Sequence, residues 1–157
     1  MRQSHKLKLE LAAAADARPI ALMSRELIEA DLPWSWTPER VARNLRQRDT
    51  LVLSVRDSER LVGFAIMQFG EERAHLSLLA VRPSYQRRGV GRRMLQWLTD
   101  SALTAGIARI HLELRAGNAG ARRFYLEHGF TETLRLPRYY SGVETAVRML
   151  RDIRVKR

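Results

Sequence analysis

The stretch that most constrains the fold is residues 76–95, where an apolar run meets a basic turn and then a helical pattern. Residues 76–81 are almost all apolar, as in a strand that is covered on both faces. Pro83 cannot donate to a sheet ladder, so it ends this strand. Small and apolar residues then recur at helical spacing from Val90 to Ala105, and Gly106 suits the position after a helix end. The sequence therefore predicts a buried strand followed closely by a helix.

The turn between this strand and this helix predicts a site for an anion. The first N–H groups of a helix have no partner within it, and the helix dipole places partial positive charge there. Gly89 and Gly91 let a ligand come close to the backbone. Full positive charges come from Arg87, Arg88 and Arg92, so the turn suits a phosphate or pyrophosphate group. An ordinary strand-to-helix turn with an arginine-rich surface has the same features, and this stretch alone leaves both interpretations open.

Two common phosphate-binding motifs do not match this turn. A P-loop needs a lysine after its last glycine, and the dinucleotide fingerprint needs a third glycine where this chain has Met94. The residues present, Gln86-Arg87-Arg88-Gly89-Val90-Gly91, fit the pattern Gln/Arg-x-x-Gly-x-Gly/Ala. This hexapeptide resembles the acetyl-CoA pyrophosphate loop of the GCN5-related N-acetyltransferase (GNAT) family.

The composition limits the classes of protein that remain. We expect a single domain over residues 1–157, because the chain is long enough for one sizeable core and too short for two. The absence of cysteine excludes a disulfide framework, a thiolate metal site and a cysteine nucleophile, and we expect no metal. No apolar run reaches the length of a membrane span, and Glu10 and Asp16 interrupt the apolar stretch near the N-terminus. We therefore expect a cytoplasmic protein without a membrane partner, either a monomer or a homodimer.

The net charge of +11 raises the question of nucleic-acid binding. Lys6, Lys8 and Lys156 are the only lysines, and the arginines are spread along the whole chain. Such a uniform preference for arginine favours coding bias over a selected binding face. The densest basic group lies around the predicted anion site, where coenzyme A, itself a polyanion, accounts for it. A nucleic-acid partner is therefore not expected.

Hydrophobic periodicity and turn residues predict a mixed α and β chain without linkers or repeats. A first helix is expected over about 16–30, and Thr37 as N-cap with Pro38 at N1 predicts the start of a second. The predicted inward residues of the first helix are Ala21, Leu22, Leu27, Ile28 and Ala30. The other predicted elements are strands at 5–11, 50–55, 61–69, 107–115 and 145–153, helices at 89–105 and 118–128, a strand from Phe130, and a loop at 137–142.

Three groups of residues suggest how a site is built. Trp36 can staple onto Val41 at the helix start, whereas Trp34 has no such local partner and is a candidate wall for a substrate. Between residues 109 and 115 apolar and polar residues alternate, which places His111 and Glu113 on one polar face. Such a row either faces solvent at a sheet edge or lines a cleft, and the spacing alone does not decide between them.

A second block strengthens the resemblance. Leu112 to Ala119 and Phe124 to Phe130 resemble the second conserved block of the GNAT family, and are most similar to bacterial ribosomal-protein-alanine N-acetyltransferases. The match runs from about residue 20 to 150. The resemblance implies an α+β GNAT fold, with a central, mostly antiparallel twisted sheet of about six to seven strands flanked by about four helices. The sheet should splay between its fourth and fifth strands. Where that branch tends to have Glu-Asp-Ala, this chain has Glu144-Thr145-Ala146, which leaves the acceptor less certain than the chemistry.

The resemblance also implies a role for each matching position. Glu113 would be the general base and Tyr125 the general acid. The implied cofactor-binding residues, which would hold acetyl-CoA as cosubstrate, are Leu79, Ala80, Val81, Arg87, Arg88, Gly89, Val90, Gly91, Arg92 and Asn118. The implied substrate-binding residues are Trp34, Tyr139 and Tyr140.

These residue types suit direct acetyl transfer to a primary amine. Glu113 can take the ammonium proton, directly or through a water, and Tyr125 can donate to the thiolate that leaves. An α-amino group has a pKa near 8 and a lysine side chain one near 10.4, so freeing the lysine nitrogen costs about 3 kcal/mol more. The sequence thus favours the N-terminal α-amino group of a protein or peptide as acceptor. A small-molecule amine, and a CoA-binding or basic binding module without turnover, stay open as alternatives.

Overall fold

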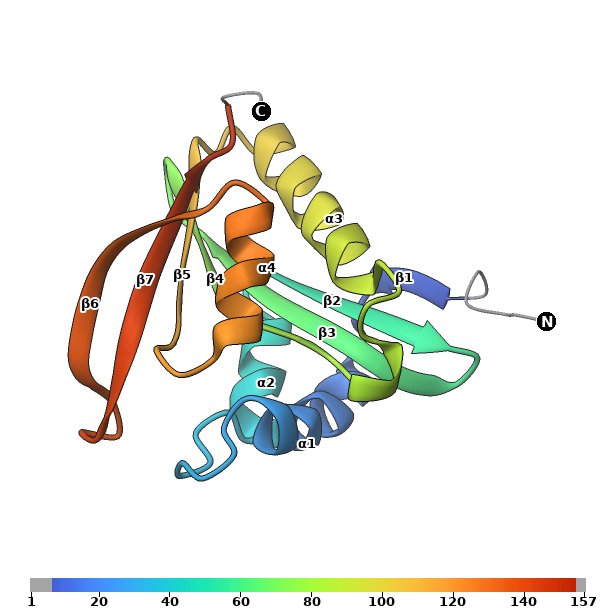
Figure 1. Ribbon diagram of the computed structural model, residues 1–157. Helices are drawn as coiled ribbons and strands as arrows, with labels where there is room; N and C mark the ends of the chain where they lie inside the picture. The colour runs from blue at the N-terminus through green and yellow to red at the C-terminus, as the bar shows by residue number, and fades with distance from the viewer. Residues whose placement is uncertain (1–6, 155–157) are drawn as a thin grey trace. The chain divides into compact units, whose positions relative to one another are not determined.

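The computed structural model describes residues 7–154, which form one seven-stranded sheet with four α-helices and two short 3-10 helices. The strand order is β1-β2-β3-β4-β5-β7-β6 (Figure 1). This mixed, mostly antiparallel architecture confirms the predicted GNAT fold. The strands are β1 (Leu7–Leu11), β2 (Thr50–Asp57), β3 (Arg60–Phe69), β4 (Arg73–Val81), β5 (Arg109–Arg115), β6 (Thr131–Tyr140) and β7 (Glu144–Asp152). The helices are α1 (Ala17–Leu27), α2 (Pro38–Leu45), α3 (Val90–Thr104) and α4 (Ala119–Glu127), with 3-10 turns at Ala14–Asp16 and Pro83–Tyr85.

The chain divides into two compact units. The first contains residues up to Gln68 together with Leu78–Leu98, and the second contains Phe69–Ser77 and the residues from Thr99 onward. The strand β4 and the helix α3 each pass from one unit to the other. None of the helices within residues 7–154 is long and apolar enough to cross a membrane.

In the first unit, α1 and α2 pack against strands that pair side by side. β1 pairs antiparallel with β2, and β2 pairs antiparallel with β3, with one register shift at Val55 and Arg56 (Figure 1). Apolar side chains from these strands and helices form the core between them, because burial of their surface is the main gain in folding. The core residues are Ala17, Ile20, Ala21, Met23, Trp36, Val41, Val52, Leu61, Phe64, Ile66, Leu78 and Ala80.

A buried carboxylate holds the loop between α1 and α2. Glu29 accepts hydrogen bonds from the Ser24 hydroxyl at 2.8 Å and from the Trp36 N–H at 3.2 Å. The backbone N–H and the hydroxyl of Ser35 both donate to the same carboxylate at 2.7 Å. A buried charge is tolerated only when it is hydrogen-bonded, and Glu29 meets this condition with groups from both ends of the loop.

The predicted start of α2 is confirmed. Thr37 has extended backbone angles, and its hydroxyl oxygen accepts from the Arg40 N–H at 3.3 Å, while Pro38 occupies the first helical position. We expect the substitution Thr37→Ala to lower the free energy of unfolding by about 1 kcal/mol, because one helix N–H loses its cap. Urea unfolding followed by circular dichroism measures this. Thr104→Ala, at the exposed C-terminal end of α3, is the control, and an equal loss in both variants would contradict the capping role.

In the second unit, β5 lies between β4 and β7. The parallel pairing of β4 with β5 covers only the first three residues of each strand, from Arg73 opposite Arg109 to His75 opposite His111. This short pairing agrees with the predicted splay between the fourth and fifth strands. β7 pairs antiparallel with β5 on one side and with β6 on the other, so that β6 is an edge strand (Figure 1).

Three local predictions are wrong. Leu22 points outward with 38% of its surface exposed, and Ile20 and Met23 fill the inward face of α1 instead. Ala30 is also exposed, because the helix ends at Leu27 and not at about residue 30. The face of β4 that carries Leu79 is only half-buried, so the strand is not equally covered on both faces. Pro137 to Tyr140 belong to β6 and not to a loop. An edge strand can include a proline, and here the register shifts between Leu136 and Tyr140. Of the strand predicted at 5–11, residues 5 and 6 lie outside the described part.

Candidate active site

The polar row of β5 lies on an interior strand and not at a sheet edge. Arg109, His111, Glu113 and Arg115 alternate with buried apolar residues along β5, which is paired on both sides. The edge interpretation of this row is therefore wrong. The Glu113 side chain retains only 5% exposure, which is unusual for a carboxylate and calls for a specific environment.

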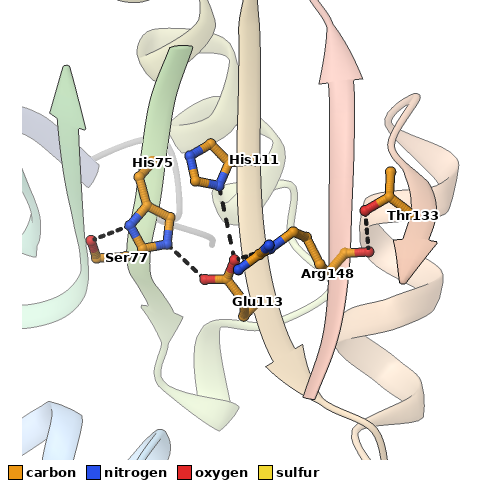
Figure 2. Close-up of polar contacts among 6 residues, drawn as sticks. All are labelled: His75, Ser77, His111, Glu113, Thr133 and Arg148. Carbon is orange, nitrogen blue, oxygen red and sulfur yellow. Dashed lines mark hydrogen bonds and ion pairs between the residues drawn. The ribbon is translucent and has the colours of Figure 1, made fainter. Parts of the chain in front are cut away.

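Both oxygens of Glu113 are engaged (Figure 2). Nε2 of His75, on β4, lies 2.8 Å from Oε1, and Nε of Arg148, on β7, donates to Oε2 at 2.7 Å. Arg148 stands directly opposite Glu113 in the register of β5 and β7. Nδ1 of His111 is 3.9 Å from Oε2, which is too long for a hydrogen bond. We call His75, His111, Glu113 and Arg148 the Glu113 cluster.

The Glu113 cluster keeps the carboxylate ionised. Burial raises the pKa of Glu113, but the contacts with His111, His75 and Arg148 outweigh burial and hold that pKa well below its usual range. A carboxylate that is this weakly basic binds and orients a cation well. Such a carboxylate does not retain a proton at neutral pH.

The two histidines of the cluster stack on each other. Their rings are 4.6 Å apart with 9° between their planes, and Nδ1 of His75 lies 3.4 Å from the Ser77 hydroxyl (Figure 2). Donor atoms of His75, His111 and Glu113 lie within 4.8 Å of one another, which raises the question of a metal site. The set does not fit one, because an ion in the plane of one ring lies outside the nearly parallel plane of the other. Arg148 also places a positive charge on the same carboxylate.

Tyr125, the predicted general acid, is buried on α4. Its ring makes edge-to-face contacts with Phe124 at 5.1 Å and with Phe130 at 5.3 Å. Burial raises the pKa of the Tyr125 hydroxyl well above its ordinary value. The hydroxyl is therefore protonated throughout the neutral range and available as a hydrogen-bond donor.

The two other predicted tyrosines lie at the end of β6. The Tyr139 and Tyr140 rings meet edge to face at 5.0 Å. Burial raises the pKa of Tyr139, and the negative charge of Glu113 raises it further, which relates this tyrosine electrostatically to the cluster. Burial also raises the pKa of Tyr140. Their role with an acceptor stays a prediction.

Asn118 has a structural task at the start of α4. Its side-chain oxygen accepts from the Ala121 N–H at 3.1 Å and so caps α4. The contact of Asn118 with a cofactor, which the resemblance implies, stays a prediction.

The predicted anion turn has the backbone form that such a site requires. Arg87 and Gly89 both have positive φ, at 63° and 79°, before α3 begins at Val90. The Gln86 side chain fixes the turn to the end of β4 by donating to the Val81 carbonyl at 2.9 Å. Arg87 and Arg92 are exposed, as is Arg88, whose guanidinium lies over the Tyr85 ring.

The structure gives Trp34 the local partner that the sequence did not reveal. Its Nε1 donates to the Ala21 carbonyl at 3.2 Å, and the Arg25 guanidinium lies over its ring. Trp34 therefore packs beside the core of the first unit, and a substrate-facing role stays a prediction. Of the β4 segment predicted to hold the cofactor, Ala80 and Val81 are buried and Leu79 is half-buried.

Sequence reasoning missed two members of the cluster. His75 and Ser77 alternate with Ala74, Leu76 and Leu78, so the polar face of β4 was visible as a period of two. No pattern in the sequence indicates that Arg148 belongs to the cluster, because only the pairing of β5 with β7 places it opposite Glu113.

The family model described as Acetyltransferase (GNAT) family matches residues 22–130. The ribosomal protein bS18-alanine N-acetyltransferase of Salmonella typhimurium is 35% identical over 136 residues, which are 78% of this chain and 92% of that protein. The N-alpha-acetyltransferase RimI of Mycobacterium tuberculosis is 34% identical over 144 residues, 88% of this chain and 87% of that protein.

Solved structures agree on the fold. The ribosomal-protein-S18-alanine N-acetyltransferase from Escherichia coli has a TM-score of 0.82 at 29% identity and covers 96% of each chain. The PaiA N-acetyltransferase from Thermoplasma acidophilum, solved in complex with coenzyme A, has a TM-score of 0.77 at 17% identity, over 93% of this chain and 98% of that one. The chain therefore belongs to the acetyltransferase (GNAT) family of enzymes.

Proposed function

We propose that this chain is an acetyl-CoA-dependent N-acetyltransferase that transfers the acetyl group directly to the N-terminal α-amino group of a protein or peptide. The observation that supports the acceptor class is the 35% identity, over most of both chains, to an enzyme named for an alanine of a ribosomal protein. A second relative, 34% identical, is named an N-alpha-acetyltransferase. The family match draws on residues of both compact units, which supports one N-acetyltransferase domain over 1–157.

Acetyl-CoA binding would rest on the turn before α3. The N–H groups at the start of a helix and the exposed arginines suit a pyrophosphate, and the positive φ of Gly89 turns the backbone into that position. The main chain of Leu79 to Val81 would hold the pantetheine arm, and Asn118 would add a contact. A fold neighbour solved with coenzyme A supports this assignment.

We expect Gly89→Ala to raise the Kd for coenzyme A about tenfold, because a Cβ makes positive φ costly and displaces the N–H groups of the turn. Calorimetric titration measures the affinity. Gly106→Ala is a matched control, since Gly106 has φ +82° just beyond the other end of α3, with open space for a Cβ. Both variants should lose stability, and an equal loss of affinity in both would contradict a role for the turn.

The chemistry needs a neutral amine, a stabilised oxyanion and a proton for the leaving thiolate. The Glu113 carboxylate draws the ammonium group of the acceptor to itself, directly or through a water, and favours its deprotonation. The β4–β5 pairing ends at His75 and His111, and a backbone N–H beyond it would serve the oxyanion. Tyr125 donates a hydrogen bond to the thiolate sulfur as the C–S bond breaks. No step requires a covalent enzyme intermediate.

The test is a panel of acceptors with acetyl-CoA. N-terminal peptides, polyamines and amino sugars are compared by the release of coenzyme A, and the acetylated atom is identified by fragmentation mass spectrometry. We expect acetylation of peptide α-amino groups with the highest kcat/KM. Turnover of small amines alone would refute the peptide acceptor, and binding of coenzyme A without any turnover would refute the enzyme assignment for this chain.

A further inference from the structure

The Glu113 cluster raises the question of where the acceptor's proton goes. Glu113 has 5% side-chain exposure, and its two oxygens face His75 and Arg148 at 2.8 and 2.7 Å. Each oxygen of this carboxylate therefore already has one hydrogen-bond partner. His75 touches this carboxylate and retains 33% side-chain exposure, the largest among the three titratable groups His75, His111 and Glu113.

We propose that the base of this site is the hydrogen-bonded pair of His75 and Glu113, in which His75 receives the proton of the acceptor ammonium while Glu113 remains an anion. This inference rests on the proposed function and names a residue that does chemistry beyond the predicted Glu113 and Tyr125. An imidazole suits the task because its neutral ring has one nitrogen that carries a hydrogen and one that accepts a proton.

The contacts of His75 determine which of its two ring nitrogens accepts the proton. An ionised carboxylate only accepts hydrogen bonds, so Nε2 of His75 must carry the hydrogen that points at Oε1. In the neutral ring Nδ1 is then the acceptor, and it faces the Ser77 hydroxyl at 3.4 Å. The proton therefore arrives at Nδ1, on the side away from Glu113. The charge that forms on the ring is stabilised by the carboxylate, as in the histidine and aspartate pair of serine hydrolases.

The groups around His75 favour it over His111. Along β4 it faces Ser77; from β5 it faces His111 and Glu113; Arg148 of β7 and Tyr139 of β6 act on it through Glu113. Arg148 lies on the other oxygen, so the negative charge nearest His75 is Oε1. His111 has no hydrogen bond to Glu113, since the closest approach is 3.9 Å, and its side chain is less exposed.

The proton count closes with this assignment. The acceptor ammonium loses one proton to Nδ1 of His75, and its nitrogen then forms the bond to the acetyl carbon while the C–S bond breaks. Tyr125 gives its proton to the sulfur, and the second proton of the acceptor nitrogen then restores the Tyr125 hydroxyl. One proton is released overall, and it leaves from the exposed imidazole to solvent.

The experiment is the pH dependence of kcat/KM at limiting peptide acceptor and saturating acetyl-CoA. The acceptor ammonium and neutral His75 together already hold the proton that the step transfers, so kcat/KM of the parent enzyme should stay nearly constant as the pH falls just below the α-amine pKa of about 8. His75→Gln keeps a hydrogen bond to Glu113 but has no base for the ammonium, so its kcat/KM should fall with a slope of one on a logarithmic plot from pH 8 downward. At pH 8 its kcat/KM should be lower by about 10²-fold or more.

Two histidine controls make the result specific. His111→Gln removes the stacked ring and should keep the flat region below pH 8, whatever its rate. His128 lies at the end of α4, where its ring contacts the Phe124 carbonyl, and His128→Gln should keep both the flat region and the rate. A flat region below pH 8 in His75→Gln, or its absence from the parent enzyme, overturns the inference while leaving the proposed function intact.

A measurement without turnover tests the same pair. Long-range proton–nitrogen NMR spectra of labelled enzyme should show neutral His75 as the Nε2–H tautomer. The Nδ1–H tautomer would overturn the inference even in a protein that acetylates no peptide, whereas failure of the whole acceptor panel would refute only the proposed function.

Discussion

Replacing Glu113 by glutamine should lower kcat/KM for a peptide acceptor by about 10²- to 10⁴-fold, the range usual for loss of a general base. The amide keeps the shape and an acceptor oxygen for Arg148, but it removes the negative charge that contacts His75 and that, under the proposed function, draws the acceptor ammonium. Steady-state kinetics with acetyl-CoA measure the effect. Glu132→Gln is the control, since Glu132 is an ion-paired carboxylate on β6 that contacts Arg122. Retention of most of the activity by Glu113→Gln would contradict the assignment.

We also expect the effect of Glu113→Gln on the free energy of unfolding to depend on pH. Since the pKa of Glu113 in the folded protein lies below the ordinary glutamate value of 4.5, the charged carboxylate stabilises the fold at pH values above 4.5. That stabilisation is lost as the pH falls through 4.5 toward the folded pKa. The difference in free energy of unfolding between parent and Glu113→Gln should therefore narrow on acidification below about pH 4.5. Urea unfolding at pH 7 and at pH 3.5 measures it, and a constant difference would contradict the charge effect.

Replacing Tyr125 by phenylalanine should lower kcat by about 10²-fold and leave the KM for acetyl-CoA nearly unchanged. The ring contacts with Phe124 and Phe130 persist, so the fold is expected to stay intact and only the donor for the thiolate is lost. Because burial raises the pKa of Tyr125, its ionisation should cause no loss of activity up to about pH 10. A parent enzyme whose activity fell between pH 8 and 10, with the fall absent from Tyr125→Phe, would contradict the buried, neutral tyrosine.

The fold could be predicted largely because its signals are local. Thr37 and Pro38 mark the start of α2 through their own chemistry, and Asn118 does the same for α4. The prediction for Leu22 is wrong because an apolar residue on α1 does not indicate which side of the helix the sheet covers. The sequence predicts a loop at Pro137 because proline usually interrupts a strand ladder, whereas its position in an edge strand depends on the tertiary structure.

The candidate site was predictable only where one strand or one turn contains it. The alternation along β5 placed Glu113 on a polar face, and the glycines before α3 marked a turn. Whether that face is an edge or an interior surface depends on β7, which begins only at Glu144, after α4 and β6. His75 and Arg148 contact Glu113 from the strands on either side of β5, and the spacing of residues along the sequence does not indicate these contacts.

The binding of Glu29 to both ends of the loop after α1 has a thermodynamic consequence. The bonds to Ser24, Ser35 and Trp36 order the backbone around Trp34 before any ligand arrives. Immobilising a loose loop on association costs conformational entropy, and this loop has lost that freedom already during folding. A ligand that meets Trp34 therefore encounters a preorganised surface, and its affinity is not reduced by freezing this segment.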